Sequence, residues 1–232
     1  MRDANPASAA ALAEELLDLD PDDVEALLMV ADAAPRYGHA EVGMLAAAHA
    51  RARGGQVGAV EAAALLAACE VDRALASAED ALRRDPANAR AYAIRGQALD
   101  LLGRPDEARS ALTRAWELRP DAFPLPLPAS DTTWDGLLPE VLSSLDPDVR
   151  DLARTVDIRF ADLPELSQLR ALAPPASPLV DALLHEQEGS TRMCVTFYRR
   201  NLARGARSLD ELAQRMREAL ASELALVEDV EP

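Results

Sequence analysis

The chain has 232 residues, which suits one or two domains, and 49% of them are apolar while only 3% are aromatic. Alanine and leucine supply most of the apolar content, which favours closely packed helices over an aromatic-rich β core. The net charge of −16 is shared equally by residues 1–122 and 123–232, so neither half has a basic surface for phosphate backbones or anionic lipids. We therefore expect no nucleic-acid binding. We also expect no membrane insertion, because no stretch reaches transmembrane length without charges.

All 24 basic residues are arginine, which excludes a catalytic lysine, a lysine Schiff base and a P-loop. The lack of lysine together with abundant alanine is typical of a GC-rich bacterial genome. Cys69 and Cys194 lie far apart, no Cys-x-x-Cys occurs, and the N-terminus does not read as a signal peptide. These features predict a protein of the reducing bacterial cytoplasm.

Residues 89–122 carry the clearest pattern in the chain. Large and small side chains alternate along a first helix, a glycine ends it, small residues recur along a second helix, and a proline closes the unit: Tyr92, Gly96, Leu99, Gly103, Ala108, Leu112, Ala115 and Pro120. This segment resembles the tetratricopeptide repeat (TPR). The small side chains at Gly96 and Ala108 let the two helices approach each other closely.

Weaker copies of the same pattern precede it. Residues 55–88 repeat the same spacing of small and large residues 34 positions upstream, and residues 23–53 form a shorter copy. Ala7–Leu19 reads as the second helix of a truncated repeat. About three helix pairs are the minimum for a stable stack. We therefore predict an all-α stack of helical hairpins over residues 1–122.

Such stacks form a concave groove lined by their first helices. The expected partner-binding positions in this groove are Leu66, Arg90, Ala93, Gln97, Asp100 and Leu101. The lining is mostly small and apolar and lacks the lysine and asparagine cluster that some TPR proteins use to hold a terminal carboxylate. It suits an apolar helix or extended segment of another protein. The alternative is that the chain's own C-terminal domain or N-terminal helix fills the groove.

A proline-rich joint, residues 123–130, is expected to separate this stack from a small α+β domain over residues 131–232. That domain should begin with a helix capped by Ser130 or Asp131. Strands are predicted at Val156–Phe160 and Met193–Tyr198. Residues 163–178 read as a loop with at most one helical turn, and Leu179–Leu184 as a strand or a short helix.

The last helix begins at Ser208, where Glu211 completes a capping box. Its apolar face is expected to comprise Leu209, Leu212, Ala213, Met216, Leu220, Leu224 and Val227. Glu223 falls on that face, and a carboxylate among core positions is costly to bury without a partner.

The strand Val195–Arg199 followed by this helix resembles the end of the minimal zincin-like metallopeptidases of bacteria. In that family the helix carries His-Glu-x-x-His, and the matching positions here are Ser222-Glu223-Leu224-Ala225-Leu226. Only the glutamate is retained. Because a catalytic zinc needs about three protein ligands, the resemblance implies a zincin-like fold without metal, cofactor or peptidase activity, with Glu223 as a vestige. The alternative is a metal-dependent peptidase that uses Glu223 with Asp229 and Glu231.

Two further sets of residues have a structural and a functional interpretation. The histidines His39, His49 and His185 are dispersed between the two expected domains, so surface or packing roles are favoured over a metal site. Arg199 and Arg200 belong to the main local basic cluster. This pair either faces nearby acidic residues or contacts an acidic surface of a partner.

The predicted function is that of a non-catalytic adaptor or regulator. The TPR-like groove and the degenerate peptidase domain would each bind protein. The partner is expected in a signalling or polarity module, such as a small GTPase and its regulator.

Overall fold

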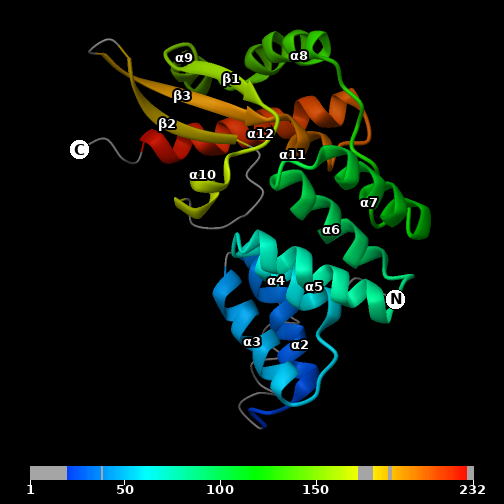
Figure 1. The fold of residues 1–232 in the computed structure, drawn as a ribbon. Helices are drawn as coiled ribbons and strands as arrows, with labels where there is room; N and C mark the ends of the chain where they lie inside the picture. Colours follow the sequence, from blue (N-terminus) through cyan, green and yellow to red (C-terminus); the bar gives the residue numbers. More distant parts are fainter. Residues whose placement is uncertain (1–19, 38, 172–179, 188–189, 229–232) are drawn as a thin grey trace. The chain divides into compact units, whose positions relative to one another are not determined.

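The computed structural model of the chain describes residues 20–37, 39–171, 180–187 and 190–228. Contacts divide the chain into two compact units, whose helices and strands Figure 1 labels. Unit 1 comprises residues 1–123 and 165–177, and unit 2 comprises residues 124–164 and 178–232. The segment 165–177, which the sequence analysis included in the second domain, thus groups with the helical unit.

In its described residues, unit 1 is a stack of three helical hairpins, which confirms the predicted helical-hairpin architecture. The hairpins are α2 with α3, α4 with α5, and α6 with α7, and α4 contacts both α2 and α6, so the first helices form one layer. Residues Ala7–Leu19 lie outside the described part of the chain. The bounds are α2 Val24–Ala33, η1 Ala34–Tyr37, α3 Ala40–Ala52, α4 Gly58–Ala67, α5 Val71–Arg84, α6 Ala89–Leu101 and α7 Pro105–Leu118.

Local chemistry explains where several of these helices begin. The Asp23 carboxylate accepts hydrogen bonds from the backbone N–H groups of Glu25 and Ala26, and the Asn88 side chain accepts one from that of Ala91. These side chains satisfy donors that have no partner within the helix. Between the helices the core is built mainly of alanines, as the composition predicted; Ala62, Ala74, Ala78, Ala91 and Ala98 are fully buried.

Unit 2 is a small α+β unit around a three-stranded sheet of order β1-β3-β2. Strand β3 pairs in parallel with β1 and antiparallel with β2, and Phe160 lies opposite Phe197 in the parallel register. The segment that the sequence left open between a strand and a short helix is a strand from Val180 onward. The bounds are α8 Asp131–Ser144, α9 Pro147–Ala153, β1 Asp157–Ala161, β2 Val180–Gln187, β3 Ser190–Tyr198, α11 Arg199–Ala203 and α12 Leu209–Glu228.

Helix α12 carries the longest apolar face of unit 2. Its residues Leu212, Met216, Leu220 and Leu224 are fully buried and pack in one core with Trp134 of α8 and Phe197 of β3. Leu209 is 46% exposed, so its expected place on this face is wrong. As the first residue of α12, Leu209 precedes the turns that pack against the core. None of the described helices combines the length and apolarity needed to cross a membrane.

Candidate partner-binding surface

The six expected groove residues lie on α4 and α6, the first helices of the second and third hairpins. Leu66 and Ala93 are only 6% and 4% exposed, because they belong to the packing between helices. Gln97, Asp100 and Leu101 are partly buried. Of the expected groove residues on α6, these last three are less buried than Ala93.

Arg90 is held by an acidic residue of its own stack. Its guanidinium forms an ion pair with Asp32, at the end of α2, and Asp32 also pairs with Arg36 at 2.9 Å. The Asp32 and Arg90 side chains are each about one-third exposed. The contact links the first helices of the first and third hairpins and neutralises the charge of Arg90. Arg90 thus has a role within the fold that its position in the repeat did not reveal.

Unit 1 also contains α10, a six-residue helix spanning Leu166–Ala171. Leu169 is 2% exposed and packs with Cys69, while Leu166 and Leu101 pack against this pair. The Cys69 thiol donates a hydrogen bond to the Leu169 carbonyl oxygen at 3.5 Å. One of the expected groove residues, Leu101, is therefore covered by a segment of the same chain.

Cys69 occupies an unusual backbone position. It lies in the turn between α4 and α5 with a φ of +60°, and Gly103 holds the matching turn 34 residues later with a φ of +72°. In both turns the next residue donates its N–H to a carbonyl near the helix end, Glu70 to Leu65 and Arg104 to Leu99, each at 2.9 Å. A side chain in this conformation is costly, and glycine avoids that cost.

Sequence reasoning did not single out Cys69, Leu166 or Leu169. One signal was present, since a cysteine stands where the repeat pattern calls for glycine. The two leucines sit three residues apart in a segment bounded by prolines, whose pattern indicated a loop with at most one helical turn. Their burial depends on docking to unit 1, which no local pattern encodes.

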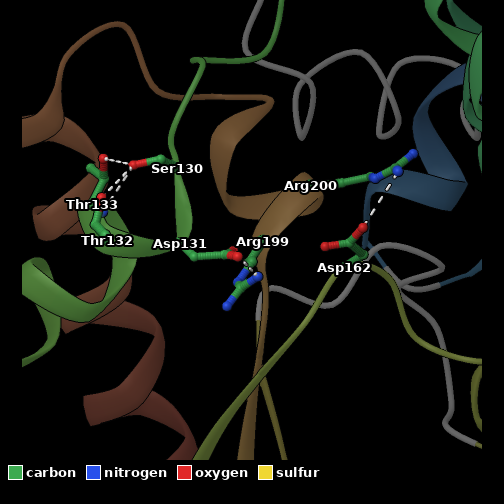
Figure 2. Close-up of polar contacts among 7 residues, drawn as sticks. All are labelled: Ser130, Asp131, Thr132, Thr133, Asp162, Arg199 and Arg200. Carbon is green, nitrogen blue, oxygen red and sulfur yellow. Dashed lines mark hydrogen bonds and ion pairs between the residues drawn. The ribbon is translucent and has the colours of Figure 1, made fainter.

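Arg199 and Arg200 begin α11 and pair with acidic residues of unit 2 (Figure 2). Arg199 donates a hydrogen bond to Asp131 at 2.7 Å, and its guanidinium lies 5.3 Å from the centre of the Phe160 ring. Arg200 pairs with Asp162 at 3.4 Å. These contacts fit the structural interpretation of the pair, and a contact with an acidic partner stays a prediction.

Glu223 is partly buried on α12, beside the fully buried Leu224, while Ser222 is exposed. Within the described residues, no three or more histidine, cysteine or acidic side chains gather as metal ligands do. Asp229 and Glu231, which the alternative peptidase site requires, lie outside the part of the chain that the structure describes.

Solved structures of MamA resemble part of this chain. A crystal structure of MamA shares 20% identity with it at a TM-score of 0.42, over 48% of this chain and 67% of the MamA chain. The MamA MSR-1 C2 structure shares 27% identity at the same TM-score, over 50% and 68% of the two chains. TM-scores of this size do not establish a shared fold. Neither the protein-family models nor the curated proteins include a match.

Proposed function

We propose that this chain is a non-catalytic adaptor or regulator that binds a protein partner through its helical stack in the bacterial cytoplasm. The observation that carries this proposal is the seating of α10 on the stack. A segment about a hundred residues away in the sequence is bound through two leucines three residues apart, which is the spacing that grooves use to bind helices, and through one backbone carbonyl. A surface that holds a segment of its own chain in this way has the chemistry to hold a segment of another protein.

The accessible part of the groove gives this proposal a direct test. Gln97 is a partly buried residue of α6, and Gln97→Arg adds a charged, bulky side chain at an expected binding position. Ser110→Arg adds the same side chain at an exposed position of α7 and is the matched control. The full chain and both variants would serve as bait in the native cell, with bound proteins quantified by mass spectrometry.

An adaptor should recover a stoichiometric partner, and Gln97→Arg should lower that recovery about tenfold while Ser110→Arg leaves it unchanged. The same interaction should then be reproduced with the two purified proteins. Recovery of no partner by the wild-type chain would contradict the proposal. A signalling or polarity module, such as a small GTPase and its regulator, is the proposed setting of that partner.

The proposal for unit 2 is a second binding surface without peptidase chemistry. It rests on the sequence, because Ser222 and Leu226 cannot replace the two histidines of a zinc site. The zincin-like resemblance stays a prediction, and restoring the motif tests it. If α12 has the zincin setting, with a third ligand in place, Ser222→His with Leu226→His should bind zinc at about one ion per chain, and the wild-type chain should bind none. Zinc in the wild-type chain that is lost on Glu223→Gln would favour a peptidase instead.

A further inference from the structure

We propose that the partner presents a short helix with two leucines three residues apart, and that this helix displaces α10 from the site formed by Cys69 and Leu101. This inference rests on the proposed function and names the chemistry of the partner. Three observations support it: the contacts of α10, the connections of α10 to unit 2 on both sides, and the presence of Cys69 in the turn between α4 and α5.

The contacts of α10 are those of a bound helical ligand. Leu169 is 2% exposed, and Leu166 packs both with it and against the larger alanine-rich core of the stack. Just before α10, the Glu165 N–H donates to the Gln168 side chain at 3.0 Å, and Ser167 between the two leucines is exposed. The two leucines thus form one apolar edge, and the two residues between them, Ser167 and Gln168, are polar.

The connections of α10 separate it from the rest of unit 1. The residues before it, up to Pro164, and those after Ser177 belong to unit 2, so α10 is tied to the repeat stack by its contacts and not by neighbouring repeats. A helix of six residues is not stable on its own in water. Its helical form therefore depends on docking, as it does for a peptide that folds when it binds.

Cys69 indicates that the turn is adapted to this contact. Glycine would relieve the cost of the positive φ, as Gly103 does in the next repeat, yet the chain keeps a side chain here. The thiol of that side chain donates to the Leu169 carbonyl and packs on the Leu169 side chain. The repeat thus departs from its own pattern at the residue that binds α10.

The docking of α10 is also of a kind that an external helix can reverse. Burial of two leucines favours docking, while the ordering of six residues opposes it, so the net stabilisation of the docked helix is small. A partner helix with the same leucine spacing makes the same contacts. It competes with a tethered segment, so its apparent affinity is set by the fraction of chains in which the site is open.

The test uses the full chain and a fluorescein-labelled peptide with the sequence of residues 163–172. Leu166→Ala combined with Leu169→Ala weakens the internal segment, and Ser167→Ala in the same helix is the matched control. The peptide should bind the double variant about tenfold or more tightly than the wild type, while Ser167→Ala should match the wild type. The same peptide with Leu166 and Leu169 both replaced by alanine should bind none of these proteins.

Cysteine labelling gives a second readout that does not depend on the peptide's fluorescence. Cys69 is 6% exposed beneath α10, and Cys194 is 2% exposed in β3 and serves as an internal reference. In the double variant, N-ethylmaleimide should modify Cys69 about tenfold faster, as read by peptide mapping, and excess peptide should restore its protection. Cys194 should keep its wild-type rate in every sample.

Two outcomes of the peptide and labelling experiments would overturn the inference. Unchanged peptide binding and unchanged Cys69 labelling would make α10 a permanent part of the fold, and rapid labelling of both cysteines would make its leucines essential to folding. Leu166→Ala alone, which alters the less buried leucine, should give an intermediate increase in both readouts. If a purified partner binds the wild type and the double variant equally, the competition is wrong while the adaptor function stands.

Discussion

Helices α6 and α7 can approach each other closely because Gly96 of α6 has no side chain. A Cβ added to Gly96 would lie 2.6 Å from Leu112 Cγ and 3.1 Å from the Ala108 carbonyl oxygen. The repeat pattern predicted this small residue, and the structure gives its reason. Gly136 of α8 differs, because an added Cβ there meets nothing within 4 Å.

These two glycines provide a matched pair of substitutions. Gly96→Ala should lower the free energy of unfolding by about 1–3 kcal/mol, because a well-packed interface must open to admit the methyl group. Gly136→Ala should raise it by about 0.5–1 kcal/mol, since alanine is the better helix former and has room. Urea unfolding followed by tryptophan fluorescence measures both, with Trp116 reporting on unit 1 and Trp134 on unit 2. Equal effects of the two changes would contradict this account.

The ion pairs of Arg199 and Arg154 with aspartates are expected to contribute differently to the stability of unit 2. The Arg199 side chain is 25% exposed and lies over the Phe160 ring, whereas the Arg154 and Asp151 side chains are 69% and 73% exposed. Exposed pairs are screened by water and contribute little. A cation over an aromatic ring keeps more of its attraction as it becomes shielded from water.

We expect Arg199→Ala to destabilise unit 2 by about 1 kcal/mol, and Arg154→Ala by less than about 0.5 kcal/mol. Arg199→Lys should recover only part of the loss, because lysine keeps the charge without the planar guanidinium. Urea midpoints read through Trp134 give all three values. A loss for Arg154→Ala as large as that for Arg199→Ala would show that ring stacking adds nothing.

At the scale of elements, α12 begins as the capping box predicted, with one change. The Glu211 N–H donates to the Ser208 hydroxyl at 3.1 Å. In return, the Glu211 carboxylate accepts from the N–H of Arg207 at 2.9 Å, where the usual box uses that of Ser208. The motif therefore fixes the first turn of the helix that fills the core of unit 2.

Removing this cap should be measurable. Ser208→Ala deletes the acceptor for the Glu211 N–H and should lower the stability of unit 2 by about 1 kcal/mol. Ser222→Ala changes the same residue type at an exposed position inside the same helix, and should alter stability by less than about 0.5 kcal/mol. Thermal unfolding by circular dichroism compares the two variants. An effect at Ser222 equal to that at Ser208 would argue against capping as the cause.

Over the whole molecule, the net charge of −16 is the property that governs encounters with other polyions. A chain that carries 40 acidic residues against 24 arginines repels nucleic acids at long range. It also favours partners whose contact surfaces are neutral or basic. The helical unit adds an apolar site to this background, so specificity is expected from apolar contacts and not from charge attraction.

We expect no binding of a labelled DNA duplex by the full chain even at about 50 mM salt, where electrostatic affinity is strongest. Fluorescence anisotropy measures this directly, with a basic DNA-binding protein as the positive control. Binding that weakens as salt increases would reveal a basic surface that the charge balance did not predict.

The sequence alone determined the helical hairpins, the strands β1 and β3, and the capping of the last helix. These features arise from residues that are close along the chain, such as Gly96 and Leu99 or Ser208 and Glu211, so their spacing is visible without any structure. The expectation for Leu209 was wrong because periodicity continues to the end of a helix while packing stops earlier.

Only the tertiary structure decided which distant residues meet. Arg90 pairs with Asp32 across the stack, and Leu169 lies on Cys69 a hundred residues away. Such contacts depend on the path of the chain through both units, and nothing in the local pattern of residues 163–178 distinguishes a docked helix from a loop. The helical stack was therefore predictable from its repeats. The docking of α10 on the stack was not, because contacts between segments that are remote in sequence form only in the folded chain.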